Sequence, residues 1–445
     1  MKKVKRRTYM ILLLPVLMLT LSVVFLFRLA SDGEDWVRFP SNLNVYAQGQ
    51  LNIGSIYDRN GVALAVPGER GLELHANAEM RRANFHAVGD RNGNIGTGAI
   101  RAYGRQLIGY NLITGVYSRG GQGNTLHLTI DAAMNRVAFE ALGGRSGSIL
   151  VMNYETGEVL VNVSGPSYDP LSPPQNAGEI EGIYLNRGLS SSFSPGSIFK
   201  IITAAAALEQ FPDALSRTFT CTGSLMVDGN LVTCTGTHGT INITQAMGHS
   251  CNPFFAQLAL DLGGNTLRNY TEDFGLLSTH RVGNTATAAG HFTAGAPGSP
   301  ALAWSGVGQS ENLVNPLSMV RFLGAIARGG VPVEPYFVSQ VTGGFLPYRA
   351  RQTGERLMPT TTAHQLQTML LDIVPVYYPN AFPGLNLAGK TGTAEVDGQR
   401  SHAWFAGFLD DPNHPYAFVV FVENGGGGLA VAGSIVNTVL QAMTR

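Results

Sequence analysis

The stretch SPGSIFKIITAAAALEQ, residues 194–210, places a serine and a lysine three positions apart at the start of a strongly apolar segment. This pattern predicts a helix that begins near Ser197, and residues three apart on a helix share one face. The run from Ile198 to Leu208 is apolar enough that the helix is expected to be buried nearly all round. Gly196 allows a sharp turn just before it. Ser197 and Lys200 are therefore a candidate catalytic pair in apolar surroundings.

This pair has the chemistry of an activated nucleophile. A free hydroxyl is a weak nucleophile and needs a base within hydrogen-bond reach. Burial lowers the pKa of a lysine, so that Lys200 is a neutral amine part of the time, whereas an arginine does not give up its proton. The free N–H groups at a helix N-terminus favour negative charge that develops near Ser197. Taken alone, Ser-x-x-Lys is a common pattern that an ordinary surface helix also explains.

The distribution of lysine supports a special role for Lys200. The chain has five lysines in 445 residues, and three of them lie within the first five positions. Beyond residue 31 only Lys200 and Lys390 remain, while arginine fills the other basic positions. A chain that uses arginine almost everywhere is expected to need an amine at the two positions where lysine is kept.

A second candidate motif is Ser250-Cys251-Asn252, which follows a short helical pattern at Thr244–Met247. The hydroxyl of Ser250 can relay a proton between Lys200 and a leaving group. Asn252 can donate to a substrate carbonyl and accept from Lys200. Taken alone, the tripeptide is also compatible with an ordinary polar loop.

A third motif, Lys390-Thr391-Gly392-Thr393, lies in an apolar context that predicts a strand. Gly392 leaves room for another backbone to lie alongside it. Thr391 and Thr393 can bind a substrate carboxylate, and Lys390 adds a positive charge. The backbone N–H groups of Ser197 and Thr393 are candidate donors to an oxyanion. A glycine turn between strands is the alternative interpretation of this motif.

The N-terminus predicts a membrane anchor. Residues 1–31 hold six basic residues and no acidic one, and an uncharged run extends from Thr8 to Phe27. A run of this length at helical rise is about the thickness of a bilayer core. Positive residues favour the cytoplasmic side, which predicts a cytoplasmic tail at 1–7, a membrane helix at 8–29 and the rest of the chain outside. A cleaved signal peptide is the alternative, but the run is long for one.

The remainder of the chain divides into two expected domains. Residues 30–143 are expected to form a separate module with a strand and Asn-Gly turn at Gly54–Gly61, a strand at Leu126–Ile130, and a helix at Asp131–Leu142. Asp58-Arg59 in this module is interpreted either as a solvated turn or as an interdomain contact. A Gly-rich stretch at 143–147 marks the boundary. Residues 144–445 have strands at both ends and helices between them, which predicts an α+β fold.

Several elements of the second domain are clear in the sequence. The expected elements are strands at Ser148–Tyr154, Val159–Ser164, Ala403–Leu409 and Tyr416–Glu423, a hairpin turn at Asp228–Asn230, and a final helix at Val431–Met443.

The charge balance and the cysteine content indicate which kinds of ligand to expect. Beyond residue 31 the chain holds 24 of its 30 basic residues and all 30 acidic ones, and this mildly acidic balance argues against nucleic-acid binding. Cys221 and Cys234 flank the hairpin turn and either pair across it or remain small core residues. No Cys/His spacing typical of a metal site is present, and neither a cofactor nor a metal is expected.

Taken in order, the three motifs resemble those of the class B penicillin-binding proteins, the monofunctional peptidoglycan transpeptidases. The match includes SPGSIFK at 194–200, HSCNPFF at 249–255 and AGKTGTAE at 388–395, and DRNG at 58–61 resembles the pedestal motif. The resemblance implies a membrane helix, an elongated mixed pedestal, and a transpeptidase domain with an antiparallel sheet, flanking helices and an all-helical part. Two positions depart from the family: Ile53 replaces an arginine, and Ser310 replaces a glycine.

The resemblance also implies an activity and partners. Ser197 would form an acyl-enzyme with a stem peptide ending in D-Ala-D-Ala, an amine from a neighbouring stem would take the acyl group, and β-lactams would acylate the same serine. Polymerisation would belong to a membrane glycosyltransferase of the shape, elongation, division and sporulation type. The alternatives are a D,D-carboxypeptidase, a β-lactamase using Glu311 and Asn315, and a non-catalytic β-lactam-binding scaffold.

Overall fold

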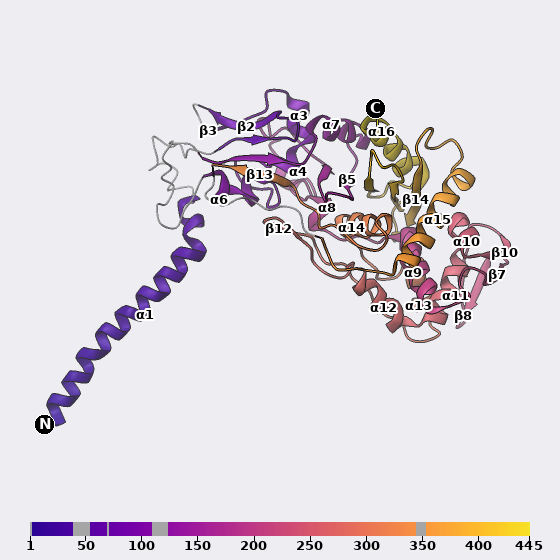
Figure 1. The fold of residues 1–445 in the computed structure, drawn as a ribbon, viewed down its shortest axis with the longest axis horizontal. Helices are drawn as coiled ribbons and strands as arrows, with labels where there is room; N and C mark the ends of the chain where they lie inside the picture. The colour runs from indigo at the N-terminus through magenta and orange to yellow at the C-terminus, as the bar shows by residue number, and fades with distance from the viewer. Residues whose placement is uncertain (1, 39–53, 69–70, 109–122, 344–352) are drawn as a thin grey trace.

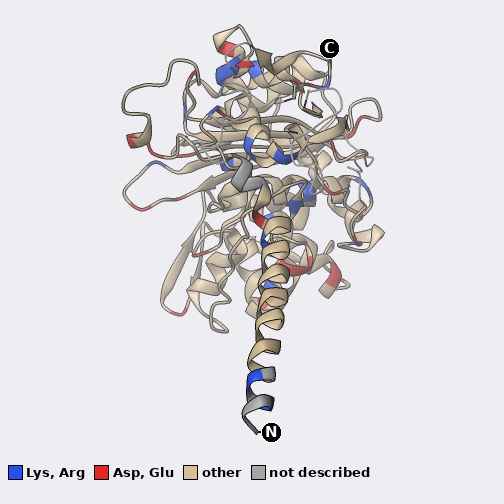
Figure 2. Cartoon of the chain, turned by 90° about the vertical axis from the view of Figure 1, so that its left-hand side faces the viewer, with Lys and Arg blue, Asp and Glu red and all other residues tan. Residues whose placement is uncertain are grey.

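The computed structural model describes residues 2–38, 54–68, 71–108, 123–343 and 353–445. It begins with one long helix, α1 (Lys2–Arg38), that projects from the rest of the molecule (Figure 1). Within α1, the segment Tyr9–Gly33 is long and apolar enough to cross a membrane, with a mean hydropathy of 2.8. Figure 2 shows a long stretch of this helix without charged residues.

The larger of the two cores is built on a five-stranded antiparallel sheet of order β14-β15-β16-β5-β6. Its strands come from both ends of the second domain, as the sequence predicts: β5 (Gly147–Asn153), β6 (Val159–Gly165), β14 (Leu387–Ala394), β15 (His402–Leu409) and β16 (Tyr416–Val422). Almost every residue of β5, β6, β15 and β16 is buried, because helices cover the sheet.

Helices cover both faces of this sheet. In Figure 1, α7 (Ala132–Leu142) and α16 (Ser434–Met443) lie above the sheet and α14 (Pro316–Ala327) lies below it. The predicted N-cap of α7 is confirmed, because the Asp131 carboxylate accepts from two backbone N–H groups of its first turn. The start predicted for the final helix is wrong: residues 428–433 form a π-helical turn, and the α-helix begins only at Ser434.

An all-helical part lies at the opposite end from the pedestal. It consists of α9 (Lys200–Gln210), α10 (Ile243–His249), α11 (Asn252–Leu262), α12 (Gly264–Asp273), α13 (Pro300–Val307) and α15 (Thr360–Tyr377). Two small hairpin-like sheets pack beside it, one of β7 (Thr218–Cys221) with β10 (Gly239–Asn242) and one of β8 (Ser224–Val227) with β9 (Asn230–Thr233). The short α8 (Arg187–Ser190), β11 (Arg281–Val282) and β12 (Thr285–Ala286) complete the domain.

The pedestal has its own hydrophobic core and its own sheet, of order β13-β4-β1-β2-β3. Its strands are β1 (Ile56–Tyr57), β2 (Ala63–Gly68), β3 (Gly71–Leu74), β4 (Thr125–Leu128) and β13 (Val338–Thr342), and its helices are α3 (Ala78–Ala83), α4 (Phe85–Val88), α5 (Ala99–Ala102) and α6 (Gly104–Leu107). Strand β13 comes from far along the chain and pairs with β4. The pedestal sheet is therefore completed by a segment of the second domain.

The Asp58-Arg59 turn packs within the pedestal and, through Arg59, also contacts the second domain, so it is not only a solvated turn. Asp58 is buried and accepts from the backbone N–H groups of Asn60, Val62 and Ala132, at 2.8–3.1 Å. The Arg59 guanidinium lies 3.7 Å from the Glu158 carboxylate at the start of β6. Ile53, where the sequence departs from the family pattern, lies outside the described residues.

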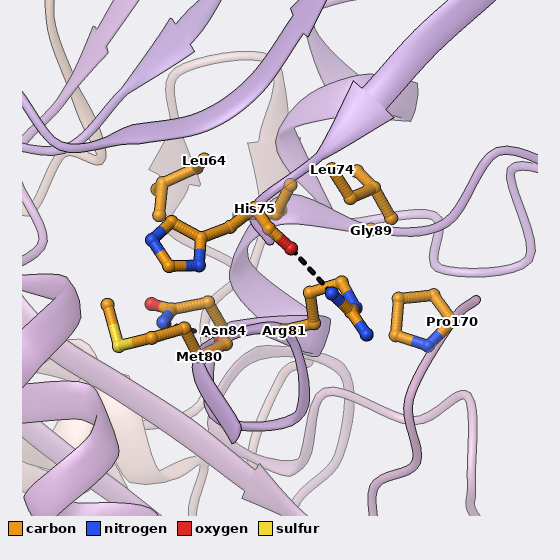
Figure 3. A pocket seen from close by; sticks show the side chains of 9 residues that line it. Leu64, Leu74, His75, Met80, Arg81, Asn84, Gly89 and Pro170 are labelled. Carbon is orange, nitrogen blue, oxygen red and sulfur yellow. Dashed lines mark hydrogen bonds between the residues drawn. The ribbon is translucent and has the colours of Figure 1, made fainter. Parts of the chain in front are cut away.

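A second contact between the domains is a nearly buried ion pair. Arg81 on α3 donates to both carboxylate oxygens of Asp169, at 2.7 and 2.6 Å, and both side chains are at most 10% exposed. Arg81 also donates to the His75 carbonyl, and it lines a small cavity together with Leu74 and Pro170 (Figure 3). The hydrogen bond from Arg81 lowers the pKa of the Asp169 carboxyl.

Removing one partner of this pair should loosen the junction. Arg81→Ala leaves a buried carboxylate without its partner, so we expect the free energy of unfolding to fall by about 3 kcal/mol. Because the folded pKa of Asp169 is lowered, the pair's stabilisation is present above the ordinary carboxyl pKa of about 3.9 and lost as pH falls through the lower folded value. Denaturant unfolding at neutral and acid pH measures both effects.

The control is Arg136→Ala, which breaks an exposed ion pair with Glu140 on α7. It should change stability by no more than about 0.5 kcal/mol. Equal losses in the two variants would contradict the role assigned to Arg81.

Candidate active site

The first motif lies on a 3-10 turn that leads directly into α9. Residues Gly196–Phe199 form this turn, and the α-helix begins at Lys200 rather than near Ser197. Side chains three apart eclipse on a 3-10 helix, so Ser197 and Lys200 still share one face, as predicted. Ser197 is partly exposed, whereas Lys200 is completely buried. The predicted burial of the helix is confirmed, since every residue from Lys200 to Ala207 is buried.

Gly196 is required by both its conformation and its surroundings. Its φ is +53°, a value that favours glycine. A Cβ atom at this position would lie 2.5 Å from the Thr393 carbonyl oxygen. The Gly196 N–H donates to the Gly308 carbonyl at 2.9 Å, which fixes the turn on its other side. Ser310, which replaces the family's glycine, adopts a φ of +66° that glycine would adopt without strain.

The Lys200 amine joins the first two motifs. Its Nζ lies 3.0 Å from Ser197 Oγ, 3.0 Å from Ser250 Oγ, 2.6 Å from the Ser250 carbonyl and 2.8 Å from Asn252 Oδ1. An ammonium has three N–H groups, so four oxygens exceed its donor capacity. As a neutral amine, Lys200 would instead offer a lone pair to a hydroxyl proton. The predicted proximity of Ser197, Lys200, Ser250 and Asn252 is therefore present in the structure.

Burial sets the protonation of Lys200. Desolvation lowers its pKa well below that of an ordinary lysine, and repulsion from the second buried lysine, Lys390, lowers it further. The thiols of Cys251 and Cys234 oppose this shift. An amine with a lowered pKa is neutral more often at physiological pH, which is the state in which it can accept a proton.

The Ser250-Cys251-Asn252 motif is a tight turn between α10 and α11. Ser250 ends α10 with a φ of +55°, a left-handed conformation that is uncommon for serine. The predicted helix before it is confirmed as α10, which begins with a capping box at Asn242 and Gln245. Asn252 accepts from Lys200, as predicted, and its Nδ2 donates to the Thr233 carbonyl of β9 at 2.9 Å.

The third motif is a strand and not a turn. Residues 390–393 lie in β14, which forms the edge of the large sheet. Gly392 packs against the start of the 3-10 turn Gly196–Phe199, which we call the nucleophile turn. A Cβ atom at Gly392 would lie 2.9 Å from the Pro195 carbonyl oxygen. The close approach predicted for Gly392 is thus confirmed. Lys390 is completely buried, and its Nζ donates to the Thr391 carbonyl at 3.1 Å.

Two aromatic residues that sequence reasoning missed hold these motifs in place. The Tyr378 hydroxyl lies 3.1 Å from Thr391 Oγ1. The indole N–H of the buried Trp404 donates to the Ser194 carbonyl at 2.9 Å, which ties β15 to the nucleophile turn. Neither residue belongs to a motif. The sequence shows only that each is an aromatic residue with a polar group near or within a strongly apolar segment, which does not identify its hydrogen-bond partner.

The arrangement suits acyl transfer through a serine. A partly exposed hydroxyl lies beside an amine with a lowered pKa, and a second hydroxyl, that of Ser250, extends the proton path from the same amine. Among the described residues, β14 pairs only with β15, and Thr391 and Thr393 are residues of this edge strand. Backbone donors on such an edge are available to a substrate.

The residues expected of a β-lactamase serve other purposes here. Glu311 is exposed and accepts from Thr293 Oγ1 at 2.7 Å. Asn315 is fully buried, caps α14 through two backbone N–H groups, and donates to the Leu189 and Ser191 carbonyls. Asn315 is therefore a helix cap, which is the structural interpretation that the following Pro316 also favours.

Comparison with known proteins identifies the family. The penicillin-binding protein transpeptidase domain matches residues 147–441. The chain is 30% identical to the peptidoglycan D,D-transpeptidase PbpA of Mycobacterium tuberculosis over 366 residues, which cover 75% of this chain and 73% of that protein. It is 29% identical to stage V sporulation protein D of Bacillus subtilis, over 74% of this chain and 54% of that protein.

Solved structures agree with this match. The ceftriaxone acyl-enzyme complex of penicillin-binding protein A from M. tuberculosis superposes with a TM-score of 0.78 at 25% identity, over 88% of this chain and 98% of that one. The D,D-transpeptidase domain of a peptidoglycan glycosyltransferase from Eggerthella lenta gives 0.76 at 26% identity, over 88% and 97%. The predicted α+β fold is confirmed by these neighbours, and the chain belongs to the penicillin-binding protein transpeptidase family, as a class B member.

Proposed function

We propose that this protein is a peptidoglycan D,D-transpeptidase that cross-links stem peptides through an acyl-enzyme on Ser197 and is acylated there by β-lactams. The observation that carries the proposal is the buried Lys200 amine, which lies within 3.0 Å of oxygen atoms from Ser197, Ser250 and Asn252. The related PbpA proteins carry this activity in their names, and a related penicillin-binding protein forms an acyl-enzyme with ceftriaxone.

The proposed reaction has two halves. Ser197 Oγ attacks the carbonyl carbon of the penultimate D-alanine while its proton passes to Lys200 Nζ. Ser250 relays a proton from Lys200 to the departing amine of the terminal D-alanine, which leaves an ester on Ser197. An amine from a neighbouring stem then attacks this ester, loses its proton to the same groups and restores the serine hydroxyl.

The third motif is proposed to bind the donor peptide. Lys390 supplies positive charge, and the hydroxyls of Thr391 and Thr393 bind the terminal carboxylate, with Gly392 letting the peptide and the nucleophile turn approach. The N–H groups of Ser197 and Thr393 are proposed to stabilise the tetrahedral oxyanion. Support for this comes from the close packing of Gly196, the residue before Ser197, against the Thr393 carbonyl.

The chain is a single-pass membrane protein, and we infer its orientation from charge. The basic tail, residues 1–7, is proposed to be cytoplasmic and the anchor to span residues 8–29, with the pedestal (30–143) and the transpeptidase domain (144–445) outside the membrane. A membrane glycosyltransferase of the shape, elongation, division and sporulation type is proposed to supply the glycan strands.

Labelling with a fluorescent penicillin tests the site directly. The wild-type chain should be labelled and Ser197→Ala should not be, because the substitution removes the proposed nucleophilic oxygen. Equal labelling of both proteins would exclude Ser197 as the nucleophile. Incubation with a D-Ala-D-Ala stem peptide and an amine acceptor should release D-alanine and form the cross-linked product. Release that is the same with and without acceptor, and that gives no cross-link, would identify a D,D-carboxypeptidase instead.

Lys200→Arg tests the proton-accepting role of the amine. Arginine keeps the charge but not the removable proton, so acylation should slow at least about a hundredfold. Lys390→Arg is the matched control and should retain more activity, because a positive charge is the main requirement there. Stopped-flow measurement of acylation by penicillin gives both rates. A near-normal rate for Lys200→Arg would show that Lys200 is not the base that accepts the Ser197 proton.

The pH dependence of acylation follows from the lowered pKa of Lys200. Because the neutral amine accumulates as pH rises through this pKa, the wild-type rate should rise with pH and level off well below the ordinary lysine value of about 10.4. A rate that keeps rising to the ordinary lysine pKa would show that Lys200 is not the titrating base.

Gly196→Ala tests the packing of the nucleophile turn against β14. The new methyl group would overlap the Thr393 carbonyl, so acylation should fall by roughly a hundredfold. Gly398→Ala is the control: Gly398 also has a positive φ, +69°, but has open space around it. It should leave the acylation rate nearly unchanged, and similar losses in both variants would contradict a specific effect on the site.

A further inference from the structure

Three cysteines and a histidine meet behind the Ser-x-Asn turn. The sulfur atoms of Cys221, Cys234 and Cys251 and a ring nitrogen of His238 all lie within 4.8 Å of one another. Cys234 Sγ lies 3.9 Å from Cys251 Sγ and 3.7 Å from His238 Nδ1. These are all the cysteines of the chain. Four side chains that favour the same kinds of metal ion therefore converge on one point.

The donors come from three segments of the chain, because Cys234 and His238 share the segment between β9 and β10. Cys221 ends β7, Cys234 directly follows β9, and His238 directly precedes β10. Cys251 caps α11 in the middle of the Ser-x-Asn motif. The sequence lacks the short Cys-x-x-Cys spacings typical of zinc sites, and pairing of Cys221 with Gly239 across β7 and β10 is what brings the ends together.

We infer that Cys221, Cys234, His238 and Cys251 bind a zinc ion as a closed structural site. Zinc takes four ligands in a tetrahedron, and three cysteines with one histidine are a usual structural set. Zn–S bonds of about 2.3 Å place neighbouring sulfur atoms about 3.8 Å apart. The Cys234–Cys251 separation of 3.9 Å and the Cys234–His238 separation of 3.7 Å are close to that geometry.

A metal accounts for the cluster better than a disulfide does. The sulfur atoms of a disulfide are about 2.05 Å apart, and all three thiols here are free. Any one disulfide would also leave the third cysteine and the histidine without a function.

The β8–β9 hairpin beside the cluster is small and contributes only Val227 and Val232 to the hydrophobic core. The β8–β9 hairpin exposes Met226 and Leu231, at 61% and 52%, and buries few of its side chains. A two-stranded hairpin is only marginally stable in water. Because the binding energy of a structural zinc is also folding energy, the ion would fasten both small sheets to the helical part.

The site also reaches the catalytic network. Cys251 lies between Ser250 and Asn252, both of which contact Lys200. The next ligand, Cys234, follows Thr233, whose carbonyl accepts from Asn252 Nδ2. Cys251 precedes Asn252 and Cys234 follows Thr233, so an ion bound to both cysteines would hold the donor and the acceptor of this hydrogen bond in place. The four ligands are therefore positioning residues for Ser250 and Asn252, a role that rests on the proposed function.

Metal content tests the site independently of activity. The full chain, purified in detergent under reducing conditions, should carry about one zinc ion per chain by mass spectrometry. His238→Ala and Cys221→Ser should lose most of it. The exposed histidine variant His364→Ala is the control and should keep it. Replacement of zinc by Co²⁺ in the wild-type chain should give the sulfur-to-cobalt charge-transfer and visible bands of a tetrahedral thiolate site.

The Co²⁺ spectrum of the wild-type chain keeps the test valid even if a variant fails to fold. Absence of those bands, a metal content that His238→Ala does not lower, or a Cys–Cys disulfide in the mapped peptides would overturn the inference.

The positioning role has its own readout. A chelator that removes the metal should slow penicillin acylation of the wild-type chain by roughly tenfold or more, and added Zn²⁺ should restore it. His238→Ala should be slow before chelation and unaffected by it. Zinc bound as described but with no change in acylation on its removal would overturn the positioning role alone. Failure of Ser197 labelling with zinc present would overturn only the proposed function.

Discussion

The active site depends on a buried amine that has more oxygen partners than protons to give them. Ser197, Ser250 and Asn252 come from segments more than fifty residues apart, and the Lys200 Nζ atom is the one point at which all of them meet. Burying a charge without full compensation is costly, so the surroundings favour the neutral form of the lysine. The helix that carries Lys200 is buried from its first residue to Ala207, and this burial lowers the pKa of the amine.

The same interaction explains the close packing around the nucleophile turn. A 3-10 turn can hold Ser197 beside Lys200 only if the chain reverses sharply before it, which is the role of Gly196. That reversal brings the turn against β14 on one side and the Gly308 loop on the other. Trp404 then donates a hydrogen bond to Ser194 before the nucleophile turn, and the Tyr378 hydroxyl contacts Thr391 on β14. The three motifs are thus parts of a single packed unit.

Much of this could be predicted from the sequence, for identifiable reasons. Strands with strong apolar character, the Asp131 and Asn315 caps, and the convergence of the three motifs have local or family signals. The roles of Trp404 and Tyr378 could not be predicted, because they depend on which backbone lies beside each side chain. The π-helical turn before Ser434 has no distinctive local pattern. His238 was missed because two of its partners, Cys221 and Cys251, come from other segments, and the pairing of β7 with β10 that brings Cys221 close has no local signal.

The return of the chain to the pedestal has a consequence for the order of assembly. Strand β13 is made only after most of the transpeptidase domain, yet it pairs with β4 in the pedestal sheet. As the chain is synthesised, the pedestal sheet remains one strand short until residue 342 has been made. The N-terminal module therefore cannot finish folding first, although it is made first, and the two domains must mature together.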